Sequence, residues 1–239
     1  MKKEAIMKTI RLGIVWKICI AIVFALVIGA CTDSSSSKST YNVTATNLTN
    51  NQPLSPQGFV LHRAGYLAWQ TGEQASDSIE RLAEDGNPSS FLDQAAADTD
   101  VLATAENGSV IIPGGSSSVE IKSKRDSDLR LSVATMLVNT NDAYTGMTDA
   151  LIGDLAVNET RIFNVPAYDA GTEANSENAA TVPGPAGGGE GYNPVQDDSG
   201  FIAVHAGVVS ADDGLTGSAL NESHRWDNPV ARITVTRIK

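Results

Sequence analysis

The sequence predicts an all-β fold, a sandwich or barrel of about eight short strands. Glycine, serine, threonine and asparagine recur along the chain, as they do in short-stranded proteins with many turns. Only 19% of the residues are charged and 5% are aromatic, and several stretches alternate apolar and polar side chains with a period of two. A length of 239 residues allows one medium domain and a targeting segment. These features disfavour a long helical bundle.

The strands are predicted from this alternation. Residues 41–48 alternate in a way that buries one face of a strand and exposes the other. The other predicted strands lie at residues 58–62, 109–112, 117–123, 129–138, 160–165, 201–209 and 230–238. Turn signals such as Asn107-Gly108 and Pro113-Gly114-Gly115 separate several of them, and no fixed-period repeat is evident. The pattern indicates one β domain with a single core.

Two helices and a long loop interrupt the strands. Residues 76–86 carry their apolar side chains on one helical face, offer Ser76 or Asp77 as an N-cap and end in a glycine. A short second helix is predicted over residues 91–96, capped by one of the two serines before it. We expect both helices at the edge of the sandwich, covering one end. The glycine-rich residues 183–191 predict a long loop and not a phosphate site, since no lysine follows and no helix opens there.

The N-terminus predicts an export signal with a lipid attachment site. Five basic residues precede an uncharged run over residues 18–30, which is the order of a secretory signal. The run is shorter than the roughly 20 apolar residues of a membrane span, and an uncleaved anchor helix is the alternative. It ends in Val27-Ile28-Gly29-Ala30-Cys31, which resembles the bacterial lipobox, where the cysteine is acylated. Met7 offers a second start besides Met1.

The chain is therefore predicted to have three parts. These are a lipoprotein signal peptide at residues 1–30, a serine-rich flexible tether at residues 31–40 and a folded domain at residues 41–239. Cys31 is the predicted lipidation site and Cys19 lies in the apolar run, so the folded domain has no thiol for a disulfide or a zinc site. We expect the protein to be exported and lipid-anchored in the bacterial cell envelope, in the outer membrane.

The charge of the chain excludes some partners. The formal charge is −11, and residues 1–30 contribute +4, so the remainder carries −15. Such a surface repels nucleic acid and anionic lipid, which leaves the N-terminal lipid as the only expected membrane contact. Acidity of this degree suits cation binding, and it is equally typical of a merely solvated surface.

Two acidic loops are candidates for a metal site. Residues 139–146 follow the most apolar predicted strand, and residues 168–175 space two carboxylates by four residues across a glycine. Calcium takes six to eight oxygen ligands and tolerates irregular geometry, so carboxylates from two loops with carbonyls and water suffice. Magnesium fits such a loop-built site less well. The same residue types are also ordinary in turns.

Three stretches in this order resemble the spondin domain family, the type of the amino-terminal domain of F-spondin, which is also found in bacterial secreted proteins. The first is Leu67-Ala68-Trp69-Gln70-Thr71-Gly72-Glu73-Gln74-Ala75-Ser76, leading into the stretch from Ile79 to Asn87. The second is Ala134-Thr135-Met136-Leu137-Val138, before Asn141-Asp142-Ala143-Tyr144-Thr145-Gly146. The third is Pro166-Ala167-Tyr168-Asp169-Ala170-Gly171-Thr172-Glu173. Their order and spacing cover nearly all of residues 41–239.

The resemblance implies an antiparallel β-sandwich similar to calcium-dependent lipid-binding domains, with one Ca²⁺ held by three aspartates. By motif, two of these fall on Asp142 and Asp169. The third falls on Glu173, whose longer arm puts affinity and denticity in question. Asn141 and Asn175 are further candidates for metal or loop contacts.

The function expected from the resemblance is a non-enzymatic binding or adhesion module that contacts a protein, glycan or matrix component. Tyr144 and Tyr168, beside the expected ion, are candidate ligand-surface aromatics. The alternatives are a periplasmic or surface hydrolase and a purely structural envelope lipoprotein. The three histidines, His62, His205 and His224, leave a hydrolase open, although no Gly-x-Ser-x-Gly or His-Glu-x-x-His motif is present.

Overall fold

The computed structural model describes residues 38–239. The predicted signal peptide at residues 1–30, the lipidation site Cys31 and the predicted tether up to residue 37 lie outside the described residues. Within residues 38–239, no helix combines the length and apolarity that crossing a membrane requires.

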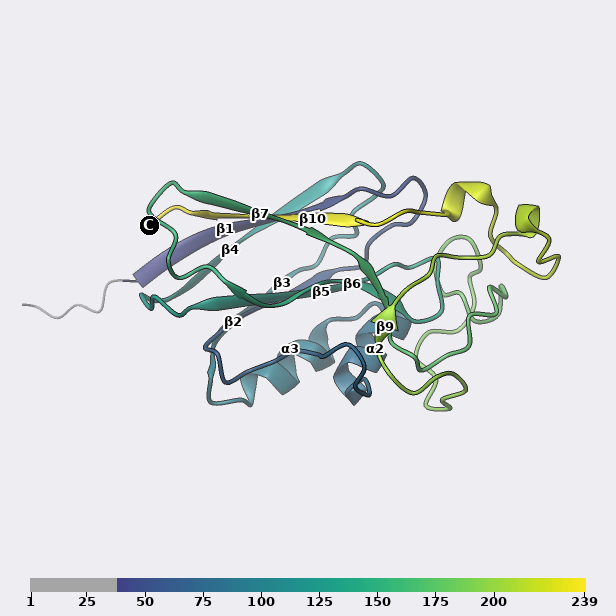
Figure 1. Ribbon diagram of the computed structural model, residues 1–239, viewed down its shortest axis with the longest axis horizontal. Helices are drawn as coiled ribbons and strands as arrows, with labels where there is room; N and C mark the ends of the chain where they lie inside the picture. Colours follow the sequence, from purple (N-terminus) through teal and green to yellow (C-terminus); the bar gives the residue numbers. More distant parts are fainter. Residues whose placement is uncertain (1–37) are drawn as a thin grey trace, which may run out of the picture. The chain divides into compact units, whose positions relative to one another are not determined.

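Two antiparallel sheets stack face to face, which confirms the predicted β-sandwich (Figure 1). The smaller sheet has the order β4-β1-β10-β7, made of β4 (Ser116–Lys124), β1 (Lys38–Asn47), β10 (Ala231–Arg237) and β7 (Thr160–Val165). The larger has the order β3-β2-β5-β6-β8-β9, made of β3 (Val101–Asn107), β2 (Gln57–His62), β5 (Arg130–Met136), β6 (Ala143–Leu151), β8 (Ala167–Asp169) and β9 (Ala203–Val204). The sheets stay separate, so the barrel alternative is wrong.

The larger sheet is covered on both faces. Phe59 and Leu61 of β2 point into the core between the sheets, and Val60 packs in a second core beneath α2 (Asp77–Asp85) and α3 (Ser89–Ala96). Figure 1 shows both helices against the outer face of this sheet. The expectation that they cover one end or edge of the sandwich is therefore corrected. The outer face of the central strands is apolar, and burying such surface stabilises the fold by about 25 cal/mol per Å².

The two helices begin in different ways. Ser76 caps α2, because its hydroxyl accepts a hydrogen bond from the N–H of Ile79 at 3.4 Å. Gly86 ends the same helix in the left-handed conformation, with φ of 72°. Before α3, no side chain makes a cap hydrogen bond, so the predicted serine cap is wrong. Pro88 precedes α3 instead, and its ring fixes φ near the helical value, at −77°.

The strand boundaries differ from the prediction in several places. β1 begins at Lys38, so the last three residues of the predicted tether belong to the strand and pair with residues 122–124 of β4. The prediction missed β3, β6 and β8. The stretch 109–112 forms only a single bridge, at Ile111. Ile111 is buried in the core between the sheets, whereas its neighbours Val110 and Ile112 are exposed. Of the stretch 201–209, only β9 is a strand.

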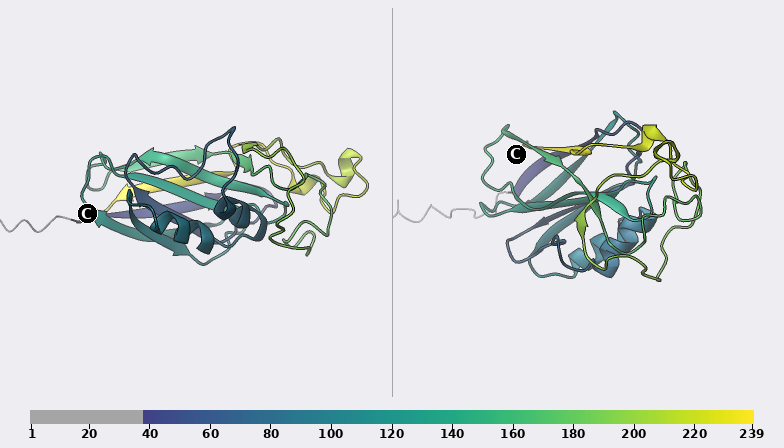
Figure 2. Two further views of the ribbon diagram at one scale, coloured as in Figure 1. Left: turned by 90° about the horizontal axis from the view of Figure 1, so that it is seen from below. Right: turned by 45° about the vertical axis from the view of Figure 1, so that its right-hand side comes forward.

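The long connection from β8 to β10, residues 170–230, forms the loop end of the domain. Apart from β9, its regular elements are the short 3₁₀ helices η1 (Ala211–Asp213) and η2 (Glu222–His224). Residues 183–191 lie in it and form a loop, as predicted. Figures 1 and 2 show this end opposite the start of β1 and the C-terminus. The start of β1 and the C-terminus are joined by a hydrogen bond from the N–H of Thr40 to the carbonyl of Lys239, at 3.1 Å.

Candidate functional site

The two predicted acidic loops meet at one end of the larger sheet. β6 and β8 are antiparallel neighbours, with Ala143 opposite Asp169. Asp142 directly precedes β6 and Asp169 ends β8, so the two carboxylates come from adjacent strand ends. The N–H of Ala170 also donates to the carbonyl of Asp142 at 3.3 Å. Strand pairing therefore brings two of the predicted metal ligands together.

The carboxylate of Asp142 is fully buried and held by the loop after β8. Its Oδ2 accepts hydrogen bonds from the N–H groups of Thr172 at 2.9 Å and Glu173 at 3.1 Å, and from the Thr172 hydroxyl at 3.2 Å. Its Oδ1 receives only a long contact of 3.4 Å from the side-chain amide of Asn141. Burial, and then the charge of Asp169, raise the pKa of Asp142 to about 7. The free Asp142 carboxylate thus has little to stabilise its negative charge at Oδ1.

Asp169 is held by a chain of hydrogen bonds. Its Oδ1 accepts from the N–H of Gly171 at 2.7 Å, and its Oδ2 accepts from the side-chain amide of Asn175 at 2.6 Å. The Oδ1 of Asn175 in turn pairs with Nε2 of His205 at 3.1 Å, while Nδ1 of His205 accepts from the N–H of Gly207 at 3.0 Å. The proton of His205 therefore lies on Nε2. Burial lowers the pKa of His205, so this ring is neutral and does not balance the charge of Asp169.

Three buried oxygens around this pair accept no hydrogen bond from the described residues. They are Oδ1 of Asn141, the hydroxyl of Tyr144 and Oε2 of Glu177. Burial, and then the charge of Asp169, raise the pKa of Glu177 to about 7. Burial, followed by the charges of Tyr168, Asp142 and Asp169, raises the pKa of Tyr144. Buried polar groups are normally paired, so a water or a cation would be needed to pair these oxygens.

No protein cation balances these acids. Among residues 38–239, no lysine or arginine forms an ion pair with Asp142, Asp169, Glu173 or Glu177. In the same part of the chain, no three Asp, Glu, His or Cys side chains form a group that could hold a metal. The donor set is therefore two carboxylates with neutral oxygens, all hard ligands from irregular loops. Such a set fits calcium, which accepts irregular geometry, better than magnesium.

Glu173 contributes its backbone to this site. Its N–H binds Asp142, and its carbonyl accepts from the Asn141 amide at 2.8 Å. Burial raises the pKa of its carboxyl to about 8, and among neighbouring charges Glu84 contributes more to this rise than Asp142. The role of the Glu173 side chain as third ligand stays a prediction.

The predicted surface aromatics lie in different environments. Tyr144 is fully buried, so its predicted place on a ligand surface is wrong. It stacks on Tyr168 at 5.5 Å and meets the edge of Trp69 at 5.3 Å between ring centroids, beneath the helices. Tyr168 is half-buried and remains the candidate for ligand contact.

The histidines occupy three separate structural positions. His62 pairs with the hydroxyl of Ser132 through Nε2 at 2.9 Å and donates from Nδ1 to the carbonyl of Arg63 at 2.7 Å, an arrangement like part of a hydrolase site. Both His62 and Ser132 are 0% exposed, so no substrate reaches the hydroxyl. His224 accepts from the N–H of Asn221 at 3.1 Å, within η2.

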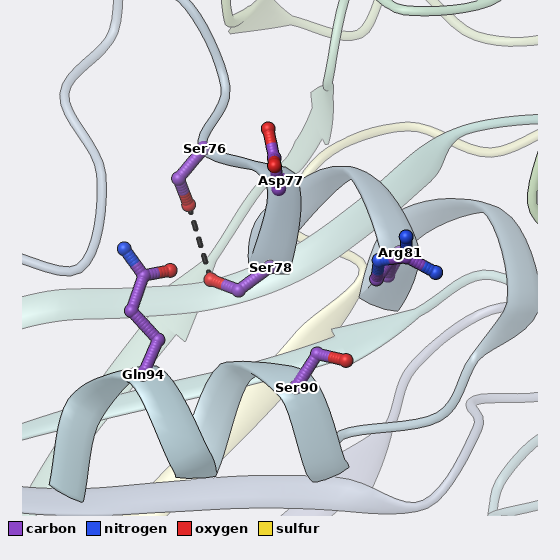
Figure 3. A pocket seen from close by; sticks show the side chains of 6 residues that line it. All are labelled: Ser76, Asp77, Ser78, Arg81, Ser90 and Gln94. Atoms are coloured by element: carbon purple, nitrogen blue, oxygen red, sulfur yellow. Dashed lines mark hydrogen bonds between the residues drawn. The ribbon is translucent and has the colours of Figure 1, made fainter. Parts of the chain in front are cut away.

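A polar hollow of about 440 Å³ lies between the two helices, and neither Asp142 nor Asp169 lines it (Figure 3). It is lined by Ser76, Asp77, Ser78, Arg81, Ser90 and Gln94. The only hydrogen bond drawn between these side chains joins Ser76 and Ser78, at 3.1 Å. Arg81 places its guanidinium 3.8 Å from the ring centroid of Tyr192. The lining side chains do not surround a common point, so this hollow has no feature of a built site.

Sequence reasoning missed two acids that face the candidate ligands. Glu177 follows the predicted loop by two residues, and continuing the spacing of acids past Asn175 would have included it. Glu84 lies on α2, where its place on a predicted helix gave no signal of contact with the distant loop. The chain is also similar to a known protein family. The family model described as Spondin_N matches residues 40–184, which include Asp142 and Asp169. None of the curated proteins matches the chain.

Proposed function

The chain belongs to the Spondin_N family, whose domains are extracellular modules of binding or adhesion type, and from this we propose that it is a calcium-binding adhesion module. The ion lies between β6 and β8, and the loop end contacts a protein, glycan or matrix component. Asp142 and Asp169 supply the charged ligands, and Asn141 supplies a neutral oxygen. The observation that carries the proposal is the pair of buried carboxylates at adjacent strand ends with no protein cation beside them among the described residues.

The ion has a structural role in this proposal. Asp142 directly precedes β6 and Asp169 ends β8, and the charge of Asp169 contributes to the raised pKa of Asp142, so mutual repulsion disfavours the approach of the two carboxylates. A divalent cation removes this repulsion and joins the two segments. The rest of the loop end has few regular elements, so a fixed base at Asp142 and Asp169 orders the surface that meets a ligand.

The proposed attachment of the protein suits this arrangement. The lipid on Cys31 would lead through the serine-rich segment to Lys38, at the end of the sandwich opposite the loop end (Figure 1). A domain anchored there presents its loops away from the membrane. Tyr168 is the aromatic residue that we expect near the ligand. Catalysis is not part of the proposal, and the burial of the His62–Ser132 pair supports this.

Thermal denaturation of the purified full chain with excess calcium or excess chelator tests the ion. Saturation at about 100 times the dissociation constant adds about 2.7 kcal/mol, which raises the Tm by roughly 5–10 °C. Asp142→Asn and Asp169→Asn are expected to lose most of this rise. Asp93→Asn, at an exposed position of α3, is the matched control and keeps it. An equal Tm in calcium and in chelator for the unmodified chain would refute the proposal.

A further inference from the structure

One edge of the smaller sheet is open. β7 pairs with β10 on one side, and no strand within residues 38–239 pairs with its other side. Ile162, in the middle of β7, is 58% exposed, and it is the only large apolar side chain that the described strands of this sheet leave exposed. An open edge with an exposed apolar residue is a template for pairing with another strand.

The backbone groups on the open side belong to alternate residues of β7. The N–H of Arg237 donates to the carbonyl of Glu159 at 3.1 Å, and the N–H of Val230 donates to the carbonyl of Val165 at 3.0 Å. The backbone groups of odd-numbered residues therefore point to β10. Since successive residues of a strand direct their N–H and C=O groups to opposite edges, those of the even-numbered residues point outward. These residues are Thr160, Ile162 and Asn164.

Other edges of the two sheets carry features that hinder pairing. β4, at the opposite edge of the smaller sheet, carries the exposed charges of Glu120, Lys122 and Lys124. β9, at one edge of the larger sheet, has only two residues. Charged side chains and short strands are the usual protection of a sheet edge.

β7 lacks this protection. Its sequence, Thr-Arg-Ile-Phe-Asn-Val, contains no lysine or proline. Its one charged residue is Arg161, whose guanidinium binds the carboxylate of Asp154 with N–O distances of 2.9 and 3.1 Å. The strand at the open edge therefore carries no unpaired charge, although the chain has a formal charge of −11.

We propose that the open edge of β7 pairs with β7 of a second copy of this chain, antiparallel and with a twofold axis at Ile162. Ile162 then lies opposite the partner's Ile162, and Thr160 lies opposite the partner's Asn164. Opposite residues of these pairs exchange both backbone hydrogen bonds, so every outward group of β7 gains a partner. The two isoleucines bury apolar surface against each other.

The same register avoids repulsion. Arg161 lies opposite the partner's Phe163, so no like charges face each other across the pair. The two smaller sheets join into one continuous sheet. Because the paired strands run in opposite directions, the two loop ends lie at opposite ends of the dimer. The pairing needs neither a calcium ion nor a lipid, so it goes beyond the proposed function and is tested apart from it.

Sedimentation equilibrium on the purified full chain, in detergent of matched density, tests the dimer. The unmodified chain is expected to shift with concentration from the mass of one chain to twice that mass. Ile162→Lys places two lysines opposite each other and is expected to stay at the mass of one chain. Val110→Lys, 54% exposed in the connection between β3 and β4, is the matched control and is expected to dimerise. Equal thermal melting curves of the two variants show that both are folded.

Cysteine variants test the position of the twofold axis. Opposite residues of a hydrogen-bonded pair have Cα atoms about 5.5 Å apart, within the disulfide range of roughly 4.4–6.8 Å. Ile162→Cys is therefore expected to form a disulfide-linked dimer under mild oxidation. Thr234→Cys, opposite Ile162 on β10, is the control, since its two copies would lie roughly 14 Å apart. The unmodified chain controls for bridges through Cys19 and Cys31.

Two further variants test the direction of pairing. Thr160→Cys and Asn164→Cys are each expected to stay unbridged alone and to bridge when they are mixed. Bridging of Thr160→Cys with itself, and not with Asn164→Cys, would show a parallel pair and overturn the proposal.

The remaining outcomes are also decisive. An unmodified chain that keeps the mass of one chain at every concentration overturns the proposal, and so does an Ile162→Lys variant that dimerises. A chain of single mass in which the Ile162 amide exchanges its hydrogen slowly would show that another segment of the same chain covers β7, and it would overturn the pairing of two copies.

Discussion

Replacing Glu177 with glutamine removes one buried negative charge from the neighbourhood of Asp169. Glu177 is 1% exposed, and its Oε1 accepts from the N–H of Val209 at 3.1 Å. Burial is the main cause of its raised pKa, and the charge of Asp169 adds to it. Glutamine keeps an acceptor for Val209 and has no carboxyl to ionise. In the absence of calcium, we therefore expect Glu177→Gln to stabilise the protein above neutral pH.

The size of the effect follows from the shift in pKa. The change from 4.5 to about 7 corresponds to about 3 kcal/mol. Since the pKa is raised on folding, the protonated carboxyl is favoured in the folded state. The contribution of the protonated Glu177 carboxyl to the free energy of unfolding is fully present below pH 4.5, and it is lost as the pH rises to about 7. Glu177→Gln has no such loss. Above pH 7 its Tm is therefore expected to exceed that of the unmodified chain by about 10 °C.

Urea denaturation in chelator, across the pH range between the two pKa values, measures this difference. The free energies of unfolding of the two proteins are expected to agree at the acid end and to diverge as the pH rises. Glu106→Gln, whose position is exposed, is expected to show no divergence. A gap between Glu177→Gln and the parent that stays constant with pH would refute the reasoning.

Three other substitutions test the packing and the anchor. Phe91→Ala opens a cavity where α3 covers the larger sheet, and we expect it to lower the free energy of unfolding by about 3–5 kcal/mol in urea; a loss under about 1 kcal/mol would mean that α3 is not part of the core. Gly146→Ala places a Cβ 1.8 Å from the carbonyl oxygen of Val133, so we expect a large loss of Tm and of soluble yield; a normal melting curve would contradict the described pairing of β5 and β6. Cys31→Ser is expected to abolish acyl labelling and to release the chain from the membrane fraction, and continued labelling would place the lipid elsewhere.

Where one face of a strand is buried and the other is exposed, the sequence predicts the strand well. β1 and β10 alternate in burial along most of their length, and their predicted bounds are close to the observed ones. β6 was missed because its first five residues are all buried, between the smaller sheet on one side and the helices on the other. Its start at Ala143 also follows Asn141 and Asp142, which are typical of a turn.

The candidate site was predictable only in part. The motifs around Asp142 and Asp169 point to those residues through their likeness to a family, and the pairing of β6 with β8 agrees with them. The spacing of residues along the chain does not show which residues surround the side chain of Glu173. Its approach to Glu84 depends on how the loop end folds over α2, a contact between distant segments. The buried state of Tyr144 has the same origin, because the helices that cover it are assembled from another part of the sequence.

The antiparallel pairing of β1 with β10 has a mechanical consequence. β1 starts at the end of the sandwich where the described residues begin, and β10 starts at the opposite end, directly after the loops. In the proposed function, a pull between the lipid anchor and a captured ligand draws the two strands past each other along their length. The backbone hydrogen bonds across the pairs from Tyr41–Arg237 to Asn47–Ala231 lie perpendicular to that pull and share the load in shear, instead of opening one after another. Under this proposal, the pairing of β1 with β10 resists force along the length of the strands.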